Sequence, residues 1–213
     1  MIVLVTGATS GFGVSIARRF AQGGHRIIAT GRRTERLDAL AAELGDAVAL
    51  TLPLDVRDRA AVERAIAGLP PELAAIDLLV NNAGLARGLE PAQRADLDDW
   101  EEMVDTNVKG LMTMTRAVLP GMVARDRGHV VNLGSTAAHW PYPGANVYGA
   151  TKAFVHQFSL NLRADLLGTK VRVTVVDPGM VGGTEFSSIR FHGDDTRAAK
   201  VYAGLYFANE RWG

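Results

Sequence analysis

Residues 6–13 read Thr6-Gly-Ala-Thr-Ser-Gly-Phe-Gly13, and this stretch decides the fold. It follows the short apolar run Ile2–Val5, which is typical of a buried strand, and it precedes residues of helical period. Glycines at positions 7, 11 and 13 allow a tight turn, so that backbone N–H groups at the start of the helix can approach a phosphate. The turn therefore predicts a dinucleotide-binding βαβ unit, with a plain strand–helix loop as the alternative.

The rest of the chain repeats the alternation of apolar, β-branched runs with stretches of helical period. The expected strands are Ile2–Val5, Arg26–Thr30, Ala47–Leu52, Asp77–Val80, His129–Leu133 and Val171–Asp177. Nearly continuous apolar strands are typical of parallel strands that are covered on both faces. Repeated β–α units imply a doubly wound parallel sheet, a Rossmann fold, with right-handed crossovers. Because no repeat or linker-like stretch interrupts the pattern, residues 1–213 are expected to form a single dinucleotide-binding and catalytic domain.

The composition excludes several classes of site. The net charge is +0, so nothing favours nucleic acid or an anionic membrane as a partner. The absence of cysteine excludes disulfides and thiolate zinc sites, and no pair of the 5 histidines has the spacing of a helix-borne metal site, so no metal is expected. No apolar run approaches the roughly 18 residues of a membrane span, and the first strand lacks the basic region of a signal peptide. A cytoplasmic location is therefore expected by default.

The residues after the second expected strand indicate which dinucleotide binds. The segment Thr30-Gly-Arg-Arg33 lacks the acidic residue that usually accepts hydrogen bonds from the ribose of NAD. Arg32 and Arg33 follow instead, and a guanidinium group suits a 2′-phosphate by charge and by its forked geometry. We therefore expect NADP rather than NAD. Alternatively, the two arginines only open the next helix on a solvated face, and Glu35 could pair with one of them.

Two further strand ends carry polar or small residues. Asp55, beside Val56, could accept a hydrogen bond from the adenine amino group, or it could cap the helix that begins near Asp58. The segment Asn81-Asn-Ala-Gly84 allows the backbone to approach a ligand closely, although adjacent asparagines are also common in turns.

Tyr148-Gly-Ala-Thr-Lys152 is the segment that predicts chemistry. Residues i and i+4 share one face of a helix, so the Lys152 ammonium would lie one turn from the Tyr148 phenol. A tyrosine, with a pKa near 10, is a poor base, but an adjacent positive charge stabilises the phenolate and lowers that pKa toward neutrality. The pair could thus transfer protons near pH 7. The alternative is a surface pair without function.

Ser135 and Asn107 make a catalytic interpretation stronger. Ser135 follows the fifth expected strand, so its hydroxyl could donate to a substrate oxygen on which charge develops, although it could also be an ordinary loop residue. Asn107 falls on the apolar stripe of its helix, between Val104 and Val108, where a buried amide needs partners. It could support the active site, or it could be a structural asparagine bonded to its neighbours.

In order and in place, these motifs resemble the signature set of the short-chain dehydrogenase/reductase family, and Pro178-Gly179 after the sixth strand matches as well. The resemblance covers nearly the whole chain. It implies that Tyr148 is the acid/base, that Lys152 lowers its pKa and binds the nicotinamide ribose, that Ser135 orients the substrate and that Asn107 supports a proton relay. The cofactor-binding residues it implies are Gly7, Thr9, Ser10, Gly11, Phe12, Gly13, Arg32, Arg33, Asp55, Val56, Asn82, Ala83, Gly84, Tyr148, Lys152, Pro178, Gly179, Val181 and Thr184.

A narrower resemblance points to a substrate class. The segments Gly134-Ser-Thr-Ala, Trp140-Pro-Tyr, Asn146-Val-Tyr-Gly-Ala-Thr-Lys-Ala-Phe154 and Val181-Gly-Gly-Thr-Glu-Phe-Ser187 are similar to NADP-dependent 3-hydroxy acid dehydrogenases, a group that includes serine/allo-threonine dehydrogenases and malonic semialdehyde reductases. This implies oxidation of a short 3-hydroxy acid at its β-hydroxyl, or the reverse reduction. A carboxylate substrate needs a cation, and Arg190 is the candidate for bidentate binding, with a surface arginine as the alternative. Trp140 and Tyr142 would then wall a small pocket, unless they only pack their own loop.

The chain departs from the family at its end. The family normally adds a helix and a seventh strand, whereas this chain ends in Tyr206-Phe-Ala-Asn-Glu-Arg-Trp-Gly213 without a clear strand period. We therefore expect the last strand to be lacking, through truncation, a shifted frame or a naturally short chain, and tetramer formation to be weakened. Both long helices of the family's dimer interface are expected, near Asp99–Arg125 and Val147–Leu167, so a homodimer or homotetramer is predicted.

Two other functions are compatible with these motifs. One is a ketoreductase of the same family for an uncharged or carrier-bound carbonyl. The other is a non-catalytic NADP-binding sensor on the same fold, since a fold alone does not determine function. Ser135, Tyr148 and Lys152 argue against the sensor, because a sensor has no need of a proton-transfer site.

Overall fold

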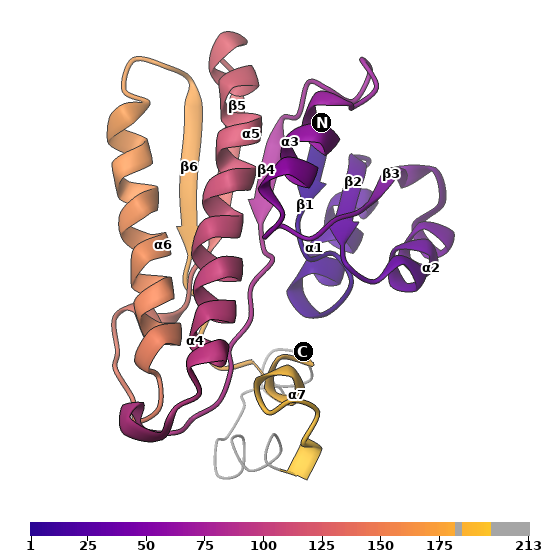
Figure 1. The fold of residues 1–213 in the computed structure, drawn as a ribbon. Coiled ribbons are helices and arrows are strands. Elements are labelled where there is room, and N and C mark those ends of the chain that lie inside the picture. The colour runs from indigo at the N-terminus through magenta and orange to yellow at the C-terminus, as the bar shows by residue number, and fades with distance from the viewer. Residues whose placement is uncertain (182–184, 197–213) are drawn as a thin grey trace, which may run out of the picture.

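The computed structural model describes residues 1–181 and 185–196 of the chain. Their architecture is one parallel sheet of 6 strands in the order β3-β2-β1-β4-β5-β6, with helices packed on both sides (Figure 1). The strands are β1 (Ile2–Val5), β2 (Arg26–Gly31), β3 (Val48–Pro53), β4 (Leu78–Asn81), β5 (Gly128–Leu133) and β6 (Val171–Val176). The predicted doubly wound sheet is confirmed, and each strand end lies within 1 residue of its predicted position. The tail 197–213, on which the missing last strand was predicted, lies outside the described residues.

The helices follow the strands in the expected alternation. They are α1 (Gly11–Gln22), α2 (Thr34–Leu44), α3 (Arg59–Ala67), α4 (Leu97–Val104), α5 (Leu111–Ala124), α6 (Asn146–Asp165) and α7 (Phe186–Arg190), with short 3-10 turns at Gly45–Ala47, Ala92–Arg94 and Thr136–Ala138. The helix expected near Asp99–Arg125 is found as one continuous helical stretch that runs from α4 into α5, and Asp105–Gly110 form a π-helical turn within it. The wider turn places Asn107 in the interior, and such turns frequently occur at functional sites.

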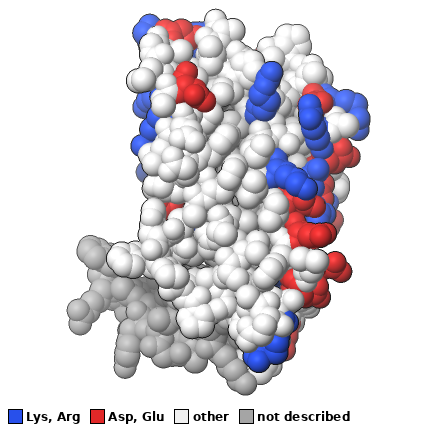
Figure 2. Space-filling view, turned by 60° about the vertical axis from the view of Figure 1, so that its left-hand side comes forward, with Lys and Arg blue, Asp and Glu red and all other residues white. Residues whose placement is uncertain are grey.

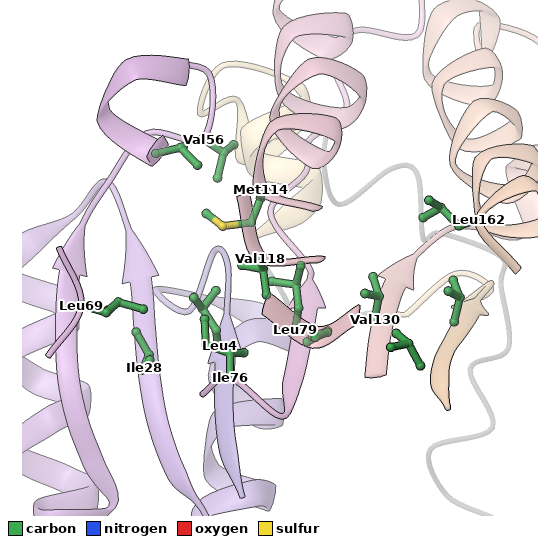
Figure 3. Close-up of a cluster of buried hydrophobic side chains, with 14 of the residues drawn as sticks. Leu4, Ile28, Val56, Leu69, Ile76, Leu79, Met114, Val118, Val130 and Leu162 are labelled. Atoms are coloured by element: carbon green, nitrogen blue, oxygen red, sulfur yellow. The ribbon is translucent and has the colours of Figure 1, made fainter. Parts of the chain in front are cut away.

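Each central strand is apolar on both faces because both faces are covered. Val3 and Val5 of β1 pack with Ala17 of α1 and Leu37 of α2 on one side. Leu4, between them, points to the other side, where residues of α5 and α6 such as Met114 and Leu162 complete the larger cluster, part of which is seen in Figure 3. Burial on two faces explains why the strands read as continuous apolar runs.

The outer surface of α5 and α6 carries few charges. Figure 2 brings the left-hand side of Figure 1, where α6 lies, forward and shows lysines, arginines and acidic residues mostly on its right-hand side and upper part, beside a broad uncharged area. Exposed apolar side chains on these two helices include Met112, Val123 and Leu160. Among the described residues, no helix has both the length and the apolar character that a membrane crossing requires.

Candidate active site

The glycine turn between β1 and α1 forms a cradle of backbone. Gly7 and Gly11 have φ angles of +65° and +51°, in the left-handed region that side chains disfavour. A Cβ atom at Gly13 would lie 2.2 Å from the Gly7 carbonyl oxygen, so the start of α1 packs directly against the turn. The turn thus leaves no room for larger residues, and it presents the first N–H groups of α1, as a phosphate site requires.

Asn82 and Thr6 hold this cradle to the end of β4. The Asn82 Nδ2 donates to the carbonyl oxygens of Thr6 at 2.8 Å and of Gly7 at 3.2 Å. The Thr6 Oγ1 accepts from the backbone N–H of Asn82 at 3.0 Å and of Ala83 at 2.9 Å. The asparagine pair is therefore more than a turn: Asn82 fixes the glycine cradle, while Asn81 points into the core and donates to Thr115 and Asn132.

A cavity of about 1260 Å³ lies beyond the carboxyl ends of the strands. Nearly every site residue expected from the sequence lines it, from the glycine cradle to Tyr148, Lys152 and Arg190. The exceptions are Gly13, which packs behind the cradle, Asn107, which supports the wall, and Thr184, which lies outside the described residues. The cavity is large enough for a dinucleotide and a small substrate together.

Tyr148 and Lys152 lie on one face of α6, at the floor of the cavity. Both are largely buried, and the Lys152 Nζ lies 5.9 Å from the centroid of the Tyr148 ring. The Nζ donates to the Leu133 carbonyl oxygen at 2.8 Å, which anchors it at the end of β5. Burial lowers the pKa of Lys152 from 10.5 to about 8, and the Asp177 charge only partly opposes this. The ammonium form still predominates at pH 7, where it can stabilise a Tyr148 phenolate.

The lowered pKa of Lys152 predicts a change in stability with pH. Between about 8 and 10.5 the unfolded chain binds this proton and the folded chain does not, so the contribution of Lys152 to stability rises with pH in that window. The full effect is about 3 kcal/mol, since one pKa unit is worth about 1.4 kcal/mol. We expect wild-type protein to gain up to that amount of unfolding free energy relative to Lys152→Met, in the absence of cofactor, as pH rises through the window.

Urea unfolding of both proteins across the window measures this gain. If the difference in unfolding free energy between Lys152→Met and wild type stays constant across the window, burial does not lower the pKa of Lys152.

Ser135 and Asn107 differ in how they are held. The Ser135 N–H donates to Asp177 Oδ1 at 3.0 Å, and its Oγ accepts from the Ala137 N–H at 3.1 Å, which leaves the hydroxyl hydrogen able to donate to a ligand. Asn107 bonds to both backbone groups of Leu85, at 2.9 and 2.8 Å, and donates to Thr151 Oγ1 at 3.1 Å. These contacts match the structural alternative for Asn107, and its role in a proton relay stays a prediction.

Arg190 is a buried cation beside the Tyr148 phenol. Its guanidinium carbon lies 5.3 Å from the Tyr148 ring centroid, and its Nη2 donates to the Tyr142 hydroxyl at 3.1 Å. The buried Nε has no hydrogen-bond partner within the described structure. The surface-arginine alternative is therefore wrong. Trp140 also lines the cavity, but it is 73% exposed, so it borders the opening and does not close a small pocket.

The arginines after β2 are not equivalent. Arg33 donates to Thr9 Oγ1 at 3.1 Å and pairs with Glu185 at 3.0 Å, so its carboxylate partner is Glu185 and not Glu35. Hydrogen bonds from Arg36 and Arg33 hold the pKa of Glu185 below its usual value despite partial burial. Arg32 is more exposed, and its ion pair with Glu102 is long, at 4.0 Å. Arg32 is thus the cation better placed to meet an added phosphate.

Asp55 was expected either to accept a hydrogen bond from the adenine amino group or to cap α3. Asp58, not Asp55, caps α3 by accepting from the Ala61 N–H at 2.9 Å. The Asp55 carboxylate lines the cavity and pairs with Arg57 at 2.6 Å. The cap was therefore wrong for Asp55, and the adenine contact stays a prediction.

Sequence reasoning missed three groups around the site: Arg36, Glu185 and Asp177. Each acts through a partner far away in the chain, and Arg36 meets Glu185 at 2.7 Å across 149 positions. Asp177 holds the backbone of Ser135, and Gly134 leaves room for it, because a Cβ there would lie 1.9 Å from Asp177 Oδ1. Only the close approach of the ends of β5 and β6 reveals this contact.

Known proteins share both sequence and fold with this chain. The model of the short chain dehydrogenase family matches residues 1–194. The NADP-dependent 3-hydroxy acid dehydrogenase YdfG of Salmonella typhi is 69% identical over 95% of this chain and 81% of its own length. The serine 3-dehydrogenase of Agrobacterium fabrum is 53% identical over 95% of this chain and 80% of its own.

A solved structure described as the closed form of serine dehydrogenase complexed with NADP+ superposes with a TM-score of 0.94, at 66% identity, over 96% of this chain and 82% of that one. The family model matches residues 1–194 of the chain, and the parallel sheet, the glycine cradle and the Tyr148–Lys152 pair are all present. The chain therefore belongs to the short-chain dehydrogenase/reductase family.

Proposed function

We propose that the chain is an NADP-dependent oxidoreductase that interconverts a short 3-hydroxy acid and its 3-oxo acid or semialdehyde. The observation that carries the substrate class is the buried guanidinium of Arg190, 5.3 Å from the Tyr148 ring, with an unpartnered Nε. A buried cation with spare donor capacity suits a carboxylate. The relatives named for 3-hydroxy acids and serine support the same class.

The residues present fit NADP. The glycine cradle would hold the diphosphate, Arg32 the 2′-phosphate, and Lys152 with the Pro178-Gly179 segment the nicotinamide end of the cavity. When bound, NADP+ would supply the hydride acceptor for oxidation of the substrate carbon.

The chain's own groups would orient the substrate and move its proton. Arg190 binds the carboxylate, and the Ser135 hydroxyl donates to the substrate hydroxyl oxygen. Tyr148, as the phenolate, takes the proton from that oxygen, and it returns the proton in the reductive direction. Lys152 keeps the phenolate accessible near neutral pH by its charge.

Replacement of Arg32 tests the cofactor preference. We expect Arg32→Ala to raise the KM for NADP+ by about tenfold or more, because a charge-assisted hydrogen bond is worth about 1.5–3 kcal/mol. The KM for NAD+, which has no 2′-phosphate, should change little. Steady-state kinetics with both cofactors measure this. Arg18→Ala, which removes a surface arginine paired with Glu43, is the matched control. Equal losses with both cofactors would contradict the assignment.

A ketoreductase for an uncharged or carrier-bound carbonyl is the second candidate, and the apolar share of the cavity wall is compatible with it. Oxidation of NADPH with malonic semialdehyde, compared with a short uncharged ketone, separates the two. We expect the semialdehyde to react with much the higher kcat/KM. Preference for the ketone would favour the alternative.

The uncharged face over α5 and α6 supports a homodimer. Met112, Val123 and Leu160 of these two helices have exposed apolar side chains, which a second copy would cover. We expect light scattering to give a mass of at least two chains, and Leu160→Glu to shift it toward one chain. A mass of one chain for the wild type would exclude the dimer. A cytoplasmic location stays a prediction.

A further inference from the structure

Three ligand-type side chains converge beside the catalytic serine, outside the wall of the cavity. They are His139, after the 3-10 turn Thr136–Ala138, His156, in the middle of α6, and Asp177, directly after β6. The His139 Nε2 lies 3.0 Å from Asp177 Oδ2, and the His156 Nδ1 lies 3.1 Å from the same oxygen. All three ligand atoms lie within 4.8 Å of one another.

We propose that His139, His156 and Asp177 form a binding site for a divalent transition-metal ion of the zinc type. Zinc takes histidine nitrogen and carboxylate oxygen ligands at about 2.0–2.2 Å, and tetrahedral ligands at that radius lie about 3.3–3.6 Å apart. The two distances to Asp177 Oδ2, 3.0 and 3.1 Å, would need to lengthen by only about 0.2–0.6 Å to reach this spacing. Mixed imidazole and carboxylate ligands favour zinc and its neighbours over magnesium or calcium, which prefer oxygen alone.

The burial of the three side chains suits a site that loads from solution. Their side chains are 41%, 29% and 20% exposed for His139, His156 and Asp177, so an ion can enter and a water can fill a fourth position. The two imidazole rings meet edge to face, with centroids 4.6 Å apart, and their nitrogens point toward the shared carboxylate. A three-ligand set with one open position is common among zinc sites.

The Asp177 carboxylate, between the two histidines, is oriented by a backbone hydrogen bond. Its Oδ1 accepts from the Ser135 N–H at 3.0 Å, which orients the group much as outer partners orient metal ligands elsewhere.

The site differs from the proposed NADP and substrate sites in both position and consequence. The residues that line the cavity include Ser135 and Trp140 but, in the part of the chain that the structure describes, none of the three ligands. A bound ion fixes Asp177, and Asp177 in turn fixes the backbone of the catalytic serine. A bound ion would therefore hold the ends of β5 and β6 together. The proposal does not depend on the identity of the hydroxy acid substrate.

The histidine spacing in the sequence did not predict this site, because its ligands come from three separate segments. No two of them lie on one helix, and positions 139, 156 and 177 meet only when β5, α6 and β6 are assembled. A search for helix-borne histidine pairs therefore misses them.

Calorimetric titration of the full, metal-free chain with Zn²⁺ in excess Mg²⁺ tests the site. We expect one Zn²⁺ per chain and a rise in melting temperature on binding, since an ion that binds only the folded state stabilises it. In the double variant His139→Gln/His156→Gln, affinity should fall by more than about 100-fold, because loss of even a group behind a ligand usually lowers it 10- to 100-fold. Co²⁺ provides a second readout through its visible absorption, which Zn²⁺ should displace.

His192 provides a matched control. It lies 3.0 Å from Asp99, which gives the same two ligand types without a third. The variant His192→Gln should bind Zn²⁺ as wild type does, and the melting temperature of each variant without metal reports whether it folds. Two outcomes would overturn the proposal. In the first, wild-type protein does not bind one Zn²⁺ per chain; in the second, the double variant is folded and binds Zn²⁺ as tightly as wild type.

Discussion

Tyr148→Phe is expected to lower kcat for a 3-hydroxy acid by about 10²–10⁴-fold, the range that a positioned general acid or base contributes. The phenol is buried at the floor of the cavity, and the Lys152 ammonium lies 5.9 Å from its ring centroid. Removal of one oxygen leaves the ring contacts with Phe186 and Arg190 in place. NADPH affinity, followed by its fluorescence, should therefore remain near wild type.

Tyr142→Phe is the matched control for this change. It also removes one phenolic oxygen from the cavity wall, but that oxygen accepts a hydrogen bond from Arg190. We expect it to change the KM of the acid more than kcat. If Tyr148→Phe keeps kcat within a few-fold of wild type, Tyr148 is not the acid/base.

Arg190→Met is expected to lower kcat/KM for a short hydroxy acid by at least about 30-fold. Loss of one partner of a buried, hydrogen-bonded charge pair costs about 2 kcal/mol or more, and every 1.4 kcal/mol is about tenfold. The methyl ester of the same acid carries no charge, so its kcat/KM should change much less. Arg190→Lys keeps the charge but loses the forked geometry, so its kcat/KM for the acid should lie between those of wild type and Arg190→Met.

The ester comparison separates binding from packing. The Arg190 side chain also lies over the rings of Tyr148 and Phe186, so its loss could disturb the site in general. A general disturbance would lower kcat/KM for the acid and the ester by the same factor, and that result would contradict a carboxylate site. Melting temperature and NADPH binding report whether each variant is folded.

Local patterns in the sequence predicted most of the fold because strands and turns depend on neighbouring residues. The run Ile2–Val5 and the glycine turn after it determine the first βαβ unit, and β1 is found at the predicted residues. The π-helical turn at Asn107 could not be predicted, since such a turn leaves no period of its own in the sequence.

The candidate site was predicted where one motif carries the chemistry and missed where two distant segments combine. Tyr148 and Lys152 are four positions apart on one helix, so their meeting follows from helix geometry. The pairing of Arg33 with Glu185, rather than with the nearby Glu35, depends on the fold of the segment after β6. The same holds for Asp177 and its two histidines.

The most direct test of the account is reduction of NADP+ by purified protein, followed at 340 nm, with serine, allo-threonine, 3-hydroxyisobutyrate and 3-hydroxypropionate as substrates and NAD+ as the comparison cofactor. We expect absorbance to rise with NADP+ and at least one of these acids, and much more slowly with NAD+. Two results would contradict an NADP-dependent 3-hydroxy acid dehydrogenase. One is that uncharged alcohols are oxidised while none of the four acids is, and the other is that NAD+ and NADP+ are reduced at equal rates.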